Sequence, residues 1–174
     1  MPSPETPTTT RFSAAFKGLH WAAVTFVLIL LYTGFTLSRE NATWHFGFGI
    51  LLLVVMVIWL AYKAGKPRPP FPADMPRWQQ IAARAVHHSL YLFVTLQPIF
   101  GLMLVTTSKG SPMAFGFIPL KIARHDAIHG IGEVLHVGNA YLIATLLALH
   151  FIGALYHHFI RRDDVLKRIL PGGA

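Results

Sequence analysis

Four long stretches without a single charged residue decide the solvent in which this chain folds. They cover residues 19–37, 44–62, 85–107 and 134–160. A helix needs about 20 apolar residues to cross the hydrocarbon core of a bilayer, so each stretch is long enough to span it. Four buried helices of a soluble bundle would each present a charged face to water, and these stretches have none. The sequence therefore predicts an all-α fold, an integral membrane four-helix bundle surrounded by lipid.

The positions of lysine and arginine predict how the bundle is oriented. The chain has 15 Lys and Arg against 7 Asp and Glu, which gives a net charge of +8. Short loops on the cytoplasmic side of membrane proteins carry an excess of Lys and Arg. If both termini are cytoplasmic, the outer loops hold only Arg39, Lys109, Lys121 and Arg124. We therefore expect cytoplasmic termini, and we do not expect a nucleic-acid partner, because topology accounts for most of the positive charge.

The segments outside the spans suggest a single domain. Residues 1–10 are rich in Pro and Thr and are predicted to be a disordered tail, followed by one domain over residues 11–174. The Pro-rich connection after the second span should be extended and should re-enter helix near Arg77. The apolar run 113–120 is too short to span, so it should lie at the outer interface or fold back onto the protein.

The cysteine and histidine contents point to one kind of site. The chain has no cysteine, which excludes disulfides, iron–sulfur clusters, thiolate zinc sites and covalently attached haem. It has ten histidines, and several fall within or at the ends of the apolar spans. Ionisable residues inside a membrane are costly and are functional candidates. The spans contain no carboxylate that could complete a zinc or non-haem iron site.

Sorting the histidines by depth gives two pairs. His136 and His150 are 14 residues apart on the fourth span, so they share a helix face about 21 Å apart along the axis. His45 lies at the depth of His136, and His20 lies at the depth of His150. Two facing imidazoles from different helices are what a bis-histidine haem iron requires.

Two further patterns bear on these pairs. Gly49 lies one turn beyond His45 with Gly47 beside it, which should allow a flat macrocycle to approach the helix backbone. Another pattern leaves an alternative open, because four histidines in and just before the fourth span share one heptad-spaced stripe and a ligand could be displaced by two turns. The stripe consists of His129, His136, His150 and His157.

Several motifs then occur in order along the chain. They include LHW at 19–21, the pair His45 and Gly49, ALYHHF at 154–159 and RDDVLKRILP at 162–171. In these motifs the chain resembles the bacterial cytochrome b561 family, the small four-helix type with two haems. The resemblance covers nearly the whole chain.

The resemblance implies a cofactor set and a cellular location. It implies two haem b groups, the inner one held by His20 and His150 and the outer one by His45 and His136, which resolves the stripe in favour of His136 and His150. It also implies a multi-pass protein of the bacterial inner membrane that exchanges electrons with ubiquinone or another quinone.

Three functions are compatible with such a cofactor set. The first is an oxidoreductase resembling superoxide oxidase, which oxidises superoxide, or another small donor, and reduces quinone. The second is a membrane anchor that relays electrons between a partner dehydrogenase or periplasmic cytochrome and quinone. The third is a haem sensor without redox turnover, which we disfavour because four fixed ligands leave no open iron position.

Two groups of residues are candidates for substrate contacts. The outer cations would steer an anion such as superoxide, although ordinary loop and haem-propionate cations explain them equally well. On the inner side, we expect His87, His157 and Arg84 to line a quinone site, since histidine can carry protons near neutral pH.

Overall fold

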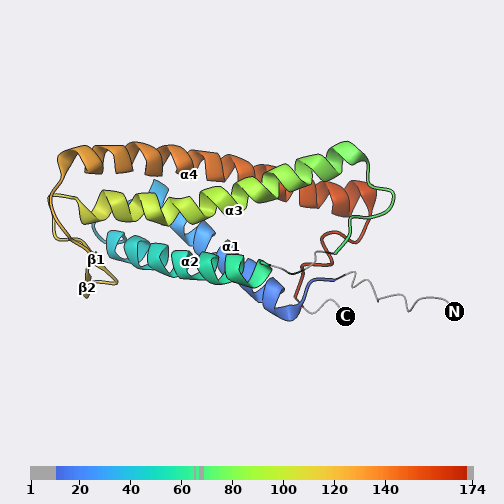
Figure 1. The fold of residues 1–174 in the computed structure, drawn as a ribbon, viewed down its shortest axis with the longest axis horizontal. Coiled ribbons are helices and arrows are strands. Elements are labelled where there is room, and N and C mark those ends of the chain that lie inside the picture. Colours follow the sequence, from blue (N-terminus) through green and yellow to red (C-terminus); the bar gives the residue numbers. More distant parts are fainter. Residues whose placement is uncertain (1–10, 65, 67–68, 172–174) are drawn as a thin grey trace.

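The computed structural model describes residues 11–64, 66 and 69–171, so the predicted disordered tail lies outside the described part of the chain. Four long helices make up most of it (Figure 1): α1 (Ala14–Phe35), α2 (Ala42–Lys63), α3 (Arg77–Thr106) and α4 (Asp126–Leu155). A short π-helix, η1 (Tyr156–Arg161), continues α4. All four helices are long and apolar enough to cross a membrane. The predicted membrane four-helix bundle is confirmed.

The helices are longer than the uncharged stretches. α3 begins at Arg77, where the sequence predicted helix to resume, and α4 begins at Asp126, eight residues before the fourth apolar stretch. The His125 side chain caps α4 by accepting from the Ile128 amide at 3.3 Å. Asp126 then lies in the first turn, where a negative charge suits the helix dipole. An uncharged stretch therefore marks only the part of a helix that hydrocarbon covers.

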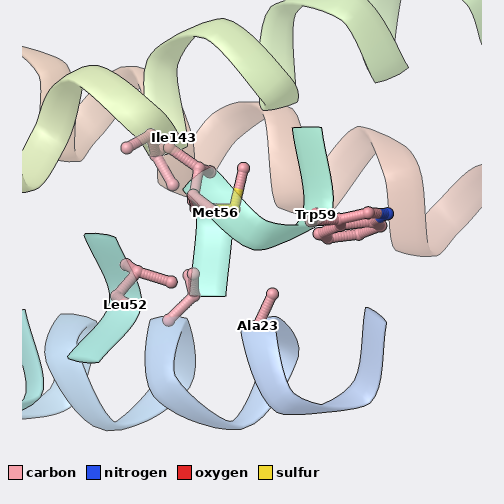
Figure 2. Close-up of a cluster of buried hydrophobic side chains, with 7 residues drawn as sticks. Ala23, Leu52, Met56, Trp59 and Ile143 are labelled. Atoms are coloured by element: carbon pink, nitrogen blue, oxygen red, sulfur yellow. The ribbon is translucent and has the colours of Figure 1, made fainter. Parts of the chain in front are cut away.

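The four helices form two antiparallel pairs joined at the centre. α3 packs along α4, α1 packs along α2, and α2 also contacts α3. The core between them includes Leu52, Met56 and Trp59 of α2, Ala23 of α1 and Ile143 of α4 (Figure 2). Met56 is only 1% exposed. We call the end at which α1 begins and η1 closes the termini end, and the opposite end the hairpin end.

A small hairpin covers the hairpin end of α2. Its strands β1 (Met113–Ala114) and β2 (Ile118–Pro119) are antiparallel. Phe115, between them, donates its backbone N–H to the Thr43 carbonyl at 2.8 Å. A Cβ at Gly47 would lie 2.5 Å from the Phe115 ring, so this glycine makes room for the hairpin. The expectation that Gly47 leaves space for a macrocycle is therefore wrong, whereas a Cβ at Gly49 would meet nothing within 4 Å.

Candidate functional site

Two histidines face each other near the hairpin end. His45 of α2 and His136 of α4 have ring centroids 6.1 Å apart. An imidazole nitrogen binds a transition metal at about 2.0–2.1 Å and the ring centre lies about 1 Å farther away, so two rings that share one metal have centroids about 6 Å apart. We call these residues the hairpin-side pair. Their spacing is that of two ligands on opposite sides of one metal atom.

Hydrogen bonds fix which nitrogen of each ring is free. His45 Nδ1 lies 2.9 Å from Thr33 Oγ1, and the Thr33 hydroxyl donates to the Ile29 carbonyl at 2.8 Å. The Thr33 oxygen therefore accepts from His45 Nδ1–H. His136 Nδ1 donates to the Gln97 carbonyl at 3.1 Å. Because both rings carry their proton on Nδ1, each Nε2 has a lone pair that can bind a metal; the lone pair of His136 accepts a long hydrogen bond of 3.4 Å from the Gln97 amide nitrogen, which a metal would replace.

Two side-chain amides lock α3 against α4 at the same depth. The Gln97 amide donates to the His136 carbonyl at 3.0 Å. Asn139 donates to Gln97 Oε1 at 2.6 Å and to the Phe93 carbonyl at 2.9 Å. The sequence analysis missed Gln97, Asn139 and Thr33. Polar amides in the middle of apolar spans were the available signal for the first two, because such groups are costly in lipid unless they are bonded.

A cavity of about 1050 Å³ surrounds the hairpin-side pair. Ligand sites usually measure about 300–1,000 Å³, so this one can take a large group. Gly49 lines the cavity next to open space, and most of the other lining residues are apolar. Arg39 and Glu133 supply charged groups to the wall. The cavity therefore suits a large, flat, mostly apolar molecule with a metal at its centre.

A second pair of histidines lies nearer the termini end. His20 of α1 and His150 of α4 have ring centroids 6.4 Å apart, again the spacing of two ligands on one metal. Trp21 and Trp59 pack edge-on against the His20 ring, with centroids at 5.3 Å and 5.9 Å. His20 Nδ1 is buried and has no hydrogen-bond partner among the described residues. We call these two histidines the termini-side pair.

His87 adds a third imidazole at this depth. Its ring centroid is 5.0 Å from that of His150, and its Nδ1 donates to the Ala83 carbonyl at 2.6 Å. Within the described part of the chain, no three His, Cys, Asp or Glu side chains are placed to hold a metal ion by themselves. A metal held by either pair would take its remaining ligands from elsewhere, and a porphyrin is one group that supplies four.

The other histidines of the heptad-spaced stripe have different partners. His129 Nδ1 donates to the Leu104 carbonyl at 2.9 Å. His157 is buried and donates from Nδ1 to Asp163 Oδ2 at 2.6 Å. Among the described residues of this stripe, His136 and His150 are thus the two whose rings face a histidine of another helix. This geometry favours His136 and His150 over the displaced alternative.

The remaining candidates lie at the termini end. Asp163 receives the bond from His157 and lies 3.4 Å from Arg161 Nε. Burial raises the pKa of the Asp163 carboxyl, but hydrogen bonds from His157 and from the Val165 amide outweigh it and leave that pKa below its ordinary value. The Arg84 guanidinium lies over the Phe71 ring at 5.3 Å. The sequence analysis did not anticipate the role of Asp163.

Comparison with known proteins identifies the family of the chain. A family model described as prokaryotic cytochrome b561 matches residues 11–172. The chain is similar to cytochrome b561 homolog 2 of Escherichia coli (strain K12), with 33% identity over 95% of this chain and 94% of the relative. It is also similar to cytochrome b561 homolog 1 of that organism (29%; 92% and 97% covered) and to a probable superoxide oxidase CybB of Yersinia pestis (28%; 92% and 96% covered).

Proposed function

Since the chain belongs to the prokaryotic cytochrome b561 family, we propose that it passes electrons from a one-electron donor at the hairpin end to a quinone at the termini end. Its family makes it a multi-pass bacterial membrane protein and an electron-transferring cytochrome b. Haem b follows from the family. Haem iron changes its charge by one electron, which is the chemistry the chain itself lacks. The chain's own residues hold, orient and enclose this group.

We assign one haem b to each histidine pair. The observation that carries this assignment is the spacing of the rings, 6.1 Å for His45 and His136 and 6.4 Å for His20 and His150. Thr33 and the Gln97 carbonyl hold the two hairpin-side rings through Nδ1 and leave Nε2 as the unprotonated nitrogen of each ring. The His20 ring packs against Trp21 and Trp59, and its buried Nδ1 has no hydrogen-bond partner among the described residues. The two sites are about 21 Å apart along α4.

Charged residues near the cavity suit an anionic cofactor and an anionic donor. Arg39 lines the cavity, where it would meet a haem propionate. Arg124, another propionate candidate, instead forms an ion pair with Asp126 at 2.9 Å. With the termini in the cytoplasm, Arg39 and Lys121 would face outward and attract a small anion. Superoxide is the donor we favour, because one relative carries the name probable superoxide oxidase.

The proposed reaction balances over two donor events. Each superoxide gives up one electron and leaves as O₂. Two electrons and two protons then convert one ubiquinone to ubiquinol. At the termini end, we propose that His87, His157 and Arg84 line the quinone site. His157 is already oriented by the Asp163 carboxylate, so its Nε2 is the atom available for proton exchange with a quinone oxygen.

A single substitution tests the quinone site. His157→Phe should lower quinone reduction several-fold and leave the visible haem spectrum unchanged. His158→Phe is the matched control. The His158 imidazole is next to His157 in the sequence, its Nδ1 has no hydrogen-bond partner among the described residues, and it has no assigned role. A His157→Phe protein that loses half its haem would make His157 an iron ligand and contradict the assignment.

The donor is tested with the purified, haem-loaded protein. Superoxide generated enzymatically should reduce the haem rapidly, and added ubiquinone should reoxidise it. Superoxide dismutase should abolish the reduction. If the haem stays oxidised until a dehydrogenase or a periplasmic cytochrome is added, the protein is a membrane anchor for that partner and the superoxide proposal is wrong.

A further inference from the structure

His20 of the termini-side pair differs from both histidines of the hairpin-side pair in the hydrogen bonding of its Nδ1. In the hairpin-side pair, both Nδ1 atoms donate to oxygen: His45 to Thr33 Oγ1 at 2.9 Å and His136 to the Gln97 carbonyl at 3.1 Å. In the termini-side pair, His20 Nδ1 is buried without a hydrogen-bond partner among the described residues. This difference acts on the atoms assigned to the iron.

An Nδ1–H bond to oxygen changes the donor strength of the opposite nitrogen. The accepting oxygen draws the proton away from the ring, so electron density rises at Nε2. A stronger nitrogen donor stabilises ferric iron more than ferrous iron, and this lowers the reduction potential. A ring without that bond is a weaker donor and leaves the potential higher.

We propose that Thr33, together with the Gln97 carbonyl, holds the hairpin-side haem at a lower reduction potential than the termini-side haem, so that electrons run from the hairpin end to the termini end. This inference rests on the proposed assignment of one haem to each pair. The step moves one electron: the hairpin-side iron is oxidised, the termini-side iron is reduced, and no bond or proton is exchanged. A one-electron donor at the hairpin end replaces the electron.

Two charged groups near the hairpin-side pair act on its potential in opposite directions. Glu133 and Arg39 both line the hairpin-side cavity. A carboxylate lowers a neighbouring reduction potential and a guanidinium raises it, so these two groups oppose each other. Gln97 is itself held by Asn139 at 2.6 Å, which fixes the carbonyl-bearing segment of α3 beside His136. Thr33 is the contact that a side-chain substitution can remove cleanly, because Gln97 acts through its backbone.

The test is a spectroelectrochemical titration of the full-length, haem-loaded protein and of Thr33→Val. Valine keeps the shape of threonine and removes the oxygen that accepts from His45. The reduction potential of the lower wave should rise by about 59 mV or more, which is a tenfold change in the equilibrium constant of a one-electron couple. Thr33→Ser, which restores the hydroxyl, should return the wave to its original position.

Thr25→Val is the matched control on the same helix. The Thr25 hydroxyl also donates to the carbonyl four residues earlier, that of Trp21 at 2.9 Å, but its side chain is exposed. Both waves should stay in place in this variant. The control separates the loss of a hydroxyl from the loss of the bond to His45.

Each other outcome has a defined meaning. If the higher wave moves in Thr33→Val, or if neither wave moves, the inference is overturned while the two-haem assignment stands. If the unmodified protein binds no haem, the proposed function itself fails. If Thr33→Val loses the hairpin-side haem, the titration is repeated with Thr33→Ala, which removes the same oxygen without the branched side chain. Loss of the haem in Thr33→Ala as well would mean that Thr33 is needed for haem binding, and it would overturn the inference.

Discussion

At the hairpin end, neutral hydrogen bonds from His45 and His136 to Thr33 and Gln97 orient the rings. At the termini end, Trp21 and Trp59 pack against His20, whose Nδ1 has no hydrogen-bond partner in the described part of the chain. Both ends reach a similar ring spacing, 6.1 Å and 6.4 Å, by these different means. Neutral hydrogen bonds satisfy polar groups inside hydrocarbon without placing a charge there. The contrast teaches that equal ligand geometry need not give equal ligand chemistry.

Charge is concentrated where the termini end meets the interface. Arg161 binds Asp74 at 2.6 Å, and Asp163 accepts from His157 at 2.6 Å. Arg168 pairs with Asp164 at 2.8 Å and donates to the Pro70 carbonyl at 2.6 Å. These bonds attach the segment after η1 to the loop before α3. Ionised side chains thus tie two separate segments together at the termini end, whereas the Arg124–Asp126 ion pair of the hairpin end joins residues two positions apart.

The largest predicted effect comes from removing one ligand of either pair. His45→Leu should halve the haem bound per chain and abolish the lower redox wave, because the hairpin-side pair loses one imidazole. His150→Leu should also halve the haem but abolish the higher wave. Haem is measured against protein by the pyridine haemochromogen method, and the waves by redox titration.

The two variants together show whether His45 and His150 bind different haems. Two variants that lose the same wave would mean that His45 and His150 serve one haem. A variant that keeps its full haem content would remove that histidine from the ligand set. Leu149→Ala, on the lipid-exposed side of α4 next to His150, is the control and should keep both waves.

A smaller effect is expected where α3 and α4 approach each other near the hairpin end. A Cβ at Gly132 would lie 2.8 Å from the Leu104 backbone nitrogen, whereas a Cβ at Gly130 would meet nothing within 4 Å. Gly132→Ala should therefore lower the free energy of unfolding by about 1–3 kcal/mol, because backbone cannot move aside as a side chain can. Thermal unfolding in detergent measures the loss. Gly130→Ala should be neutral or slightly stabilising, and equal losses in both would contradict the close contact.

The smallest effect concerns the ionised network at the termini end. Asp163→Asn should cost roughly 1 kcal/mol, since it weakens the bond to the buried His157. Asp164→Asn should cost less, because Asp164 is half exposed and its pair with Arg168 is screened by water. Thermal unfolding of the two variants in parallel measures the difference.

The pH dependence of the Asp163 contribution has a fixed sign. Its pKa is lower in the folded protein than in the unfolded chain, so its contribution is present above about pH 4 and is lost as the pH falls through the folded pKa. The gap between the unmodified protein and Asp163→Asn should close on acidification below pH 4. A gap that widens there would contradict the assigned direction.

Long uncharged stretches predicted the spans, and the regular geometry of a helix predicted the histidine pairs, because its rise per residue sets depth and its 3.6 residues per turn set the face. His45 with His136 and His20 with His150 followed from those two quantities. Thr33, Asp163 and the hairpin over Gly47 did not, because each depends on a contact that no period encodes. Thr33 meets His45 across a helix pair, and Phe115 reaches Gly47 from a separate loop. Such contacts require the packed helices themselves.

The most direct measurement of the central claim is the number of haem groups per purified chain, together with their coordination by electron paramagnetic resonance. Two haem b per chain, both low-spin with two histidine ligands, is the result that the spacing of the two pairs predicts. A colourless protein, a single haem, or a high-spin iron with an open position would contradict it.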